Sequence, residues 1–395
     1  MPVLEMRDKN RSGGPESPPV APRLEESDTV RILQRMGPVS LGVSLPRGWV
    51  GSHHLAVGSP VRLRSGQDGT IRIRAGEDGS RVVPQFRVTV PPHLPPEHLF
   101  RSLLGAYLAG ASDFEVHQPG GIRPETRGVA RTFARRTILP EVISEEAELL
   151  RLRDASEASP VPLEKLVVRM GQLVLDLQRE AGETWSRPPG GSSLTWHSRD
   201  DEVDRQAWFI ERSAVRLLDG DGSDRAPQSG MGPLGCWTVA RSLERIADHA
   251  VRLGESGTHL SEGSVPPTHL VSLSQFHDQS LRHLQAVLVA LGQGTGARAN
   301  ELLDAGEALH EVARTLSERL FPSAGGVMDL PPSSAIALGR ILESIDRTVA
   351  YAQDIAQVAL DRALPLTPAP PDAVLSRPLS RATPNKKRQG GIEKK

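Results

Sequence analysis

Residues 240–250 read ARSLERIADHA, and this stretch decides how the C-terminal half of the chain is interpreted. In a helix, Glu244 and Asp248 lie one turn apart on the same face. The opposite face carries apolar residues at spacings of three and four, namely Leu243, Ile246, Ala247 and Ala250. Two carboxylates at this spacing repel each other unless a cation or an arginine lies between them. The pattern predicts either a site for a hard or borderline metal ion, or a solvated acidic face paired with Arg241 and Arg245.

The same helical periodicity continues on both sides of this stretch. From Pro162 onward, apolar residues recur at three and four residues, and breaks that contain Gly or Pro separate the segments. Six helices are predicted, the first over residues 162–177 and the others over about 198–218, 234–256, 268–291, 298–320 and 333–362.

These helices fall into two sets of three that repeat a pattern of charges. The second helix of each set carries an acidic pair, Asp201 and Asp204 in one set and Asp304 and Glu307 in the other. The third helix carries an acid followed by arginine, Glu244-Arg245 and Asp346-Arg347. The period is about 100 residues, which predicts a duplicated three-helix unit.

The N-terminal part has a different pattern. Residues 29–75 alternate apolar and polar side chains like short strands, and the turn pairs Gly37-Pro38 and Asp68-Gly69 divide them into hairpins. Seven arginines against one aspartate give this segment a net charge of +6, which suits binding to DNA phosphates. An isolated hairpin is marginally stable in water, so a second copy of the chain is expected to complete the domain.

Residues 81–150 are predicted to form a small α/β region. A strand-like piece covers Val82 to Val90, one helix covers Glu97 to Ala109, and a second helix rich in arginine covers Thr126 to Arg136.

Composition limits the classes of function. The net charge of the whole chain is -1, so a surface for nucleic acid must be local. Cys236 is the single cysteine, which excludes an intramolecular disulfide and a thiolate zinc site and indicates a core thiol. The longest apolar run, residues 284–291, is too short to span a bilayer, and we expect a cytoplasmic protein without membrane insertion.

Residues 240–250 resemble the metal-binding E(D)xxxD signature of the PhoU phosphate-uptake regulators, which are duplicated three-helix bundles. Asp200, Asp204, Arg205 and Trp208 resemble the acidic helix that precedes it in that family. The resemblance implies a non-enzymatic, negative regulator of phosphate transport and homeostasis that binds iron or zinc. The implied metal ligands are Glu244, Asp248, Asp200 and Asp204 in the first set, and Asp304, Glu307 and Asp346 in the second. Ala350 stands where Asp248 stands in the first set, so the second site lacks one ligand.

The N-terminal segment resembles the SpoVT/AbrB swapped-hairpin DNA-binding domain, in the form that archaeal regulators fuse to PhoU-like domains. The residues that carry this resemblance are 31–36, 43–50 and 55–73. It implies a homodimer that binds DNA through Arg31, Arg35 and Arg47. The chain has Ser59-Pro60 where that family commonly has an acid after the glycine, so this turn is expected to differ.

Together these observations predict an α+β multidomain protein. The expected parts are a disordered tail (1–27), a swapped-hairpin β domain (28–76), an α/β connecting region (77–155), two three-helix repeats (156–263 and 264–364) and a disordered basic, Pro-rich tail (365–395). The expected partners are DNA, a second copy of the chain, and phosphate transporter or sensor proteins.

Two alternatives remain open on the sequence. One is a PhoU-like scaffold that acts on a phosphate transporter or kinase without binding DNA. The other is a carboxylate-bridged metalloenzyme, for which Glu307 and His310 supply one Glu-x-x-His pair. A di-iron bundle needs a second such pair, and no other histidine lies three residues after a glutamate.

Overall fold

The computed structural model describes residues 30–65, 70–76, 85–155, 162–185, 193–218, 231–260, 265–293, 295–321 and 330–364. The chain divides into two compact units, Met1–Arg81 and Val82–Lys395. The two predicted disordered tails and the predicted turn at Asp68-Gly69 lie outside the described residues. In the part of the chain that is described, no helix is both long and apolar enough to cross a membrane.

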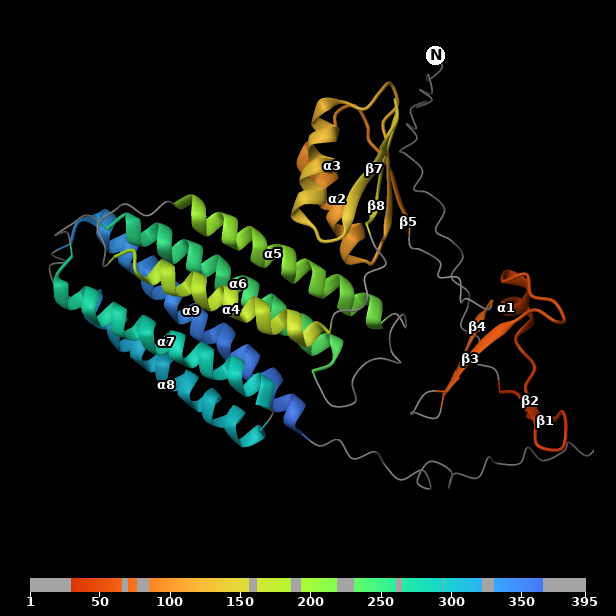
Figure 1. Ribbon diagram of the computed structural model, residues 1–395. Helices are drawn as coiled ribbons and strands as arrows, with labels where there is room; N and C mark the ends of the chain where they lie inside the picture. The colour runs from red at the N-terminus through yellow and green to blue at the C-terminus, as the bar shows by residue number, and fades with distance from the viewer. Residues whose placement is uncertain are drawn as a thin grey trace, which may run out of the picture. The chain divides into compact units, whose positions relative to one another are not determined.

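The described residues of the first unit form two hairpins and one short helix (Figure 1). Strands β1 (Gln34–Arg35) and β2 (Leu41–Gly42) pair antiparallel, as do β3 (Val61–Ser65) and β4 (Ile71–Ala75). Between the hairpins lies α1 (Arg47–Ser52). The sequence predicted only strand-like alternation here, and that prediction is wrong for α1. Pro46 precedes the helix with φ -59°, which suits helix entry, and its carbonyl accepts from the N–H of Val50.

The first unit has no buried residue among those described between 30 and 76. Its apolar side chains are instead open to solvent, with Val30 95%, Ile32 84% and Val39 96% exposed. Soluble monomers rarely leave so much apolar surface uncovered within a small region. The described residues of this unit therefore form no core of their own in a single copy of the chain.

The second unit begins with an α/β domain. Its elements in chain order are β5 (Gln85–Thr89), α2 (Pro96–Leu108), β6 (Asp113–His117), α3 (Pro124–Arg136), β7 (Pro140–Glu145) and β8 (Leu149–Asp154). The sheet order is β5-β6-β8-β7, with β5 and β6 parallel and the other pairs antiparallel. Helices α2 and α3 lie on one face of the sheet (Figure 1). Both helices were predicted from the sequence, whereas β6, β7 and β8 were not.

An aromatic cluster forms the core of this domain. The ring of Phe133 on α3 meets Phe114 on β6 at 5.3 Å and Tyr107 on α2 at 6.1 Å between centroids, both edge to face. All three side chains are fully buried. This aromatic packing fixes both α2 and α3 against the central strands of the sheet.

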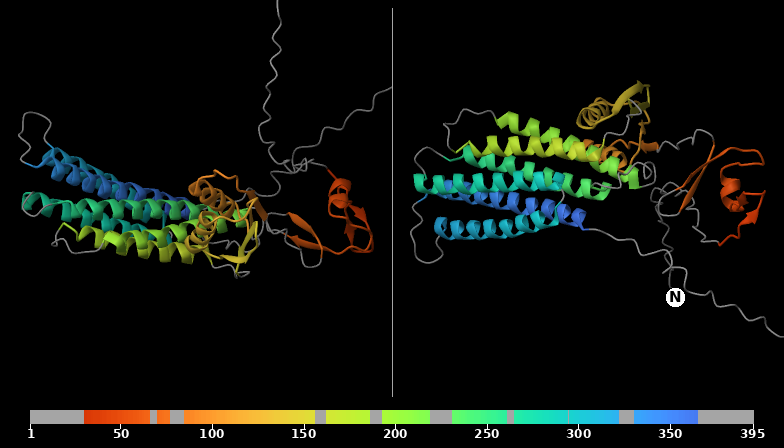
Figure 2. Two further views of the ribbon diagram at one scale, coloured as in Figure 1. Left: turned by 90° about the horizontal axis from the view of Figure 1, so that it is seen from above. Right: turned by 60° about the horizontal axis from the view of Figure 1, so that its bottom comes forward.

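The described residues of the C-terminal half form an all-α bundle of six helices, as the sequence predicts. They are α4 (Leu163–Gly182), α5 (Ser193–Arg216), α6 (Pro233–Thr258), α7 (Pro267–Gln293), α8 (Gly296–Leu320) and α9 (Pro332–Ala363). The helices run side by side along the bundle (Figure 2). The two successive sets, α4–α6 and α7–α9, share one apolar core. Cys236 is 1% exposed within it, and burial raises the pKa of its thiol to about 12, so it is a core thiol.

A buried polar group joins the two sets inside this core. The amide nitrogen of Gln178 on α4 donates to the Ile246 carbonyl at 3.0 Å and to Thr348 Oγ1 at 2.9 Å. Its amide oxygen lies 3.4 Å from His277 Nε2 on α7. Burial lowers the pKa of His277 to about 4, so the ring is neutral at physiological pH. A Cβ at Gly182 would lie 2.1 Å from the same ring, so only glycine permits this approach of α4 to α7.

The α/β domain is joined to the bundle through α5. Arg212 on α5 is 1% exposed, and its Nη2 donates to Asp154 Oδ2 at 2.6 Å and to Ser112 Oγ at 3.3 Å. Its guanidinium also lies 4.3 Å from the centre of the Tyr107 ring. A buried guanidinium needs such partners because an unpaired charge in the interior is strongly unfavourable.

Candidate functional site

Four carboxylates meet where α5 packs against α6. Asp200 and Asp204 lie on α5, and Glu244 and Asp248 lie on α6. We call these four residues the acid cluster. Burial, followed by the charges of Asp200 and Glu244, raises the pKa of Asp204 to about 7. The structure thus brings together the four acids that the sequence proposed for the first repeat.

The carboxyl of Asp200 has a raised pKa and an oxygen without a hydrogen-bond partner. Burial, followed by the charges of Asp248 and Asp201, raises its pKa to about 6. Its Oδ1 is buried without a hydrogen-bond partner in the part of the chain that the structure describes. Burial also raises the pKa of Glu244, and Arg241, with Nη1 at 3.8 Å from Glu244 Oε2, opposes that effect. Burial first, and repulsion between the acids second, thus favour the neutral, protonated form of Asp200 and Asp204.

One arginine from the α/β domain partly balances the acid cluster. Nη2 of Arg136, in the last turn of α3, donates to Asp201 Oδ1 at 2.7 Å and to Asp204 Oδ2 at 3.1 Å. Its guanidinium lies 5.3 Å from the centre of the Trp208 ring and 5.9 Å from that of Phe100. Arg136 was not identified from the sequence, because its partners lie more than sixty residues away in the chain. These ion pairs make α3 part of the site.

The donor atoms of the acid cluster suit a cation, but they are not gathered into a closed coordination sphere. Carboxylate oxygens are ligands for hard cations, and the unpartnered Oδ1 of Asp200 can accept one. Among the described residues, however, no group of three or more His, Cys, Asp or Glu side chains is close enough to hold a metal ion. A bound cation would therefore require the carboxylates to move closer together, and it would compete with Arg136.

The acids of the second repeat make a different arrangement. His310 on α8 lies 2.6 Å from Asp346 Oδ1 through Nδ1 and 2.8 Å from Gln353 Oε1 through Nε2. Gln353 Nε2 donates to Glu307 Oε1 at 3.1 Å. Burial lowers the pKa of His310, but the hydrogen bonds to Asp346 and Gln353 outweigh it and the net shift is upward. Asp346 and Glu307 are thus tied to protein partners, and Asp304 is exposed on α8.

The three arginines predicted to bind DNA all lie exposed on the first unit. Arg31 precedes β1, Arg35 is paired with Leu41 across the first hairpin, and Arg47 is the first residue of α1. Their guanidinium groups are accessible, and their role in binding DNA stays a prediction.

The comparison with known families bears on the segment that contains the acid cluster. The family model of the PhoU domain matches residues 167–257. The matched range of the PhoU domain runs from α4 through α6, so it includes all four acids, and it ends before α7 begins. The predicted PhoU resemblance is thereby confirmed for the first repeat. The resemblance of the N-terminal segment to SpoVT/AbrB domains stays a prediction.

Two solved structures of PhoU proteins are similar to this chain. One is the phosphate transport system regulatory protein PhoU from Streptococcus pneumoniae, with 19% sequence identity and a TM-score of 0.42, covering 51% of this chain and 92% of that chain. The other is PhoU from Pseudomonas aeruginosa, with 19% identity and a TM-score of 0.43, covering 51% of this chain and 94% of that chain. No curated protein matches the chain.

Proposed function

We propose that this protein is a cytoplasmic, DNA-binding regulator of phosphate uptake that represses transcription of phosphate transport genes. The observation that carries the proposal is the match of residues 167–257 to the PhoU domain, which contains the acid cluster. The net charge of +6 on residues 29–75 supports the DNA-binding part, since phosphate neutralisation by arginine drives such association. No enzymatic step is assigned to the chain.

Genome-wide DNA occupancy, measured in cells grown at high and at low phosphate, tests this function. We expect occupancy near phosphate transport genes that differs between the two conditions by about fivefold or more, the lower end of typical allosteric couplings. Occupancy that does not respond to phosphate, or that avoids those genes, would contradict the proposal. Absence of any occupancy would favour a scaffold that acts on a transporter or sensor protein.

The first unit is proposed to act as a homodimer. Its apolar side chains, including Ile32, Leu41 and Ile71, are 84%, 65% and 67% exposed, and the described residues of the unit bury none. A second copy offers the same apolar strands and closes the surface by symmetry. A mass in solution of one chain, 42.7 kDa, rather than two would refute this arrangement.

The acid cluster of the first repeat is proposed to bind iron or zinc. Asp248→Ala should lower the bound metal to whatever the second repeat retains, as measured by elemental analysis. Because the pKa of Asp200 is raised to about 6 and that of Asp204 to about 7, protons should displace metal as the pH falls from about 7 to about 6.

The same two carboxyls give the metal-free protein a pH dependence of defined sign. Their folded-state pKa values lie above the ordinary value of 3.8, so the folded state holds protons that the unfolded state has released. Stability should therefore fall as the pH rises from about 4 to about 7, and added metal should restore it.

Asp278→Ala, which removes an exposed carboxylate on α7, is the control for Asp248→Ala and should leave the metal content unchanged. Equal metal content in Asp248→Ala and Asp278→Ala would show that the acid cluster does not bind the metal.

A further inference from the structure

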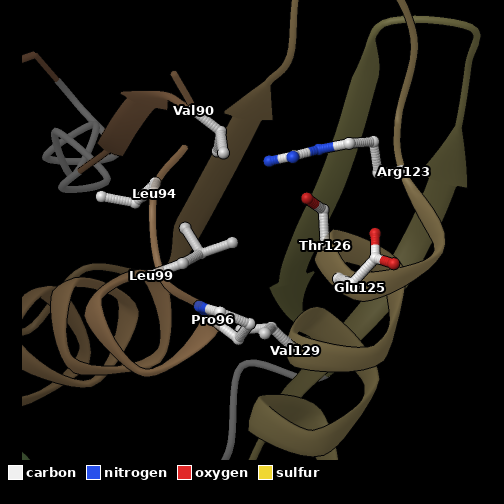
Figure 3. Close-up of a pocket in the computed structure, with 8 residues that line it drawn as sticks. All are labelled: Val90, Leu94, Pro96, Leu99, Arg123, Glu125, Thr126 and Val129. Carbon is white, nitrogen blue, oxygen red and sulfur yellow. The ribbon is translucent and has the colours of Figure 1, made fainter. Parts of the chain in front are cut away.

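A small cavity lies in the α/β domain, away from the acid cluster, where α2 and α3 both begin (Figure 3). Its volume is about 90 Å³, and it is open on one side. The apolar wall consists of Val90, Leu94, Leu99 and Val129. Val90 and Leu99 are each 2% exposed, so this wall belongs to the core of the domain. Pro96, the first residue of α2, completes it.

One corner of the cavity is polar and carries hydrogen-bond donors. Thr126 is 3% exposed and lines the cavity. Arg123 donates from Nη1 to the Pro92 carbonyl at 2.5 Å, but its buried Nε has no hydrogen-bond partner within the described ranges. Figure 3 shows the hydroxyl of Thr126 and the guanidinium of Arg123 facing the same space. A buried guanidinium nitrogen without a partner is costly, which indicates that a ligand completes the polar corner of the cavity.

The start of α3 adds to this corner. Arg123 is the N-cap of the helix, Pro124 is at its first position, and no side chain caps it. The first N–H groups of a helix lack intrahelical acceptors and carry a partial positive charge. The cavity therefore joins a guanidinium, a hydroxyl and a helix N-terminus, all of which favour a bound anion.

Two features separate a carboxylate from phosphate as the anion. Five of the eight lining residues are apolar and offer no donors to the additional oxygens of a phosphate. Glu125 also lines the cavity, and its negative charge disfavours a dianion more than a monoanion. We propose that this cavity binds a small carboxylate that carries a short branched apolar group. The carboxylate accepts hydrogen bonds from Arg123 and Thr126, and the apolar group packs against Leu94, Leu99 and Val129.

The cavity lies at one end of α3. The opposite end of the same helix carries Arg136, which pairs with the acids on α5. The binding site itself is independent of the proposed role in phosphate uptake, and it holds even if the protein regulates another process.

Titration calorimetry on the full chain with isobutyrate, isobutyramide and inorganic phosphate tests this assignment. Isobutyrate should bind saturably, and the amide of the same shape should bind at least about tenfold more weakly, because it carries no negative charge to pair with the guanidinium of Arg123. Arg123→Gln and Thr126→Val should each weaken isobutyrate by about tenfold or more. Thr126→Ser, which keeps the hydroxyl, should retain binding and shows whether a loss in Thr126→Val comes from misfolding.

The matched control is Arg135→Gln, which removes an exposed arginine on the same helix and should bind isobutyrate like the wild type. Equal affinity for isobutyrate and isobutyramide would overturn the inference, as would saturable binding of phosphate without isobutyrate. Absence of saturable isobutyrate binding to the wild type would overturn it as well. None of these results bears on DNA occupancy at phosphate transport genes, so the two proposals can fail separately.

Discussion

Replacement of Arg212 by leucine should lower the free energy of unfolding of the second unit by about 3 kcal/mol. The substitution leaves the carboxylate of Asp154, 10% exposed, without its 2.6 Å partner. It also removes the stacking of the guanidinium on Tyr107. Arg216, 3.7 Å from the same carboxylate, compensates in part and places the expected loss at the lower end of the range for broken buried pairs. Urea unfolding followed by circular dichroism measures the change.

Arg205→Leu on the same helix is the control for this experiment. Arg205 is 37% exposed and pairs with Glu202 one turn away, so its removal should cost at most about 0.5 kcal/mol. In the double variant that also replaces Asp154 by leucine, part of the stability should return, because no buried carboxylate is left without its arginine. Equal losses of stability for Arg212→Leu and Arg205→Leu would show that the buried pair does not hold the α/β domain to α5.

Simultaneous replacement of Arg31, Arg35 and Arg47 by alanine should nearly abolish DNA binding by the full chain. In a dimer the change removes six exposed positive charges. The slope of log K against log salt should fall by about 0.9 for each phosphate that is no longer neutralised, or by about five in total. Fluorescence anisotropy with a duplex, repeated over a series of salt concentrations, gives both the affinity and the slope.

A triple variant in the bundle controls for the change in net charge. Arg298, Arg314 and Arg319 are exposed on α8, and their replacement by alanine alters the charge of the chain by the same amount. This variant should keep the wild-type affinity and slope, and both variants should keep the mass of a dimer. If the N-terminal triple variant retains the wild-type salt slope, these arginines do not bind DNA phosphates.

The sequence predicted the helical half well and the α/β domain only in part. Helices α4 to α9 are each at least 20 residues long, so a period of 3.6 is repeated often enough to identify them. Strand β6 has only five residues, and although Asp113 to His117 alternates with Phe114 and Val116 inward, so short a pattern also occurs in loops. Helix α1 was missed because Gly48 and Gly51 weaken its helical signal.

The acids of the first repeat could be proposed from spacing, but their electrostatic surroundings could not. Spacing places Glu244 and Asp248 on one face of α6, and the family pattern adds Asp200 and Asp204. The partners that set their charge come from distant segments. Arg136 lies 65 residues before Asp201 in the chain, and a similar separation of 58 residues hides the pair of Arg212 and Asp154. Only the packing of α2 and α3 against α5 brings these groups together.

Arg136 has a further consequence for the cations that are proposed to bind at the acid cluster. Because the folded α/β domain holds this guanidinium beside Asp201 and Asp204, it acts as a tethered competitor with an effective concentration at least in the millimolar range of short linkers. A monovalent cation that replaces it exchanges one weak ion pair for another, whereas a multivalent ion attracts every carboxylate that it reaches. The proposed cation site would thus be selective for valence before any coordination geometry applies. The affinity that a cation needs to displace Arg136 depends on how α3 packs, although α3 supplies none of the carboxylates.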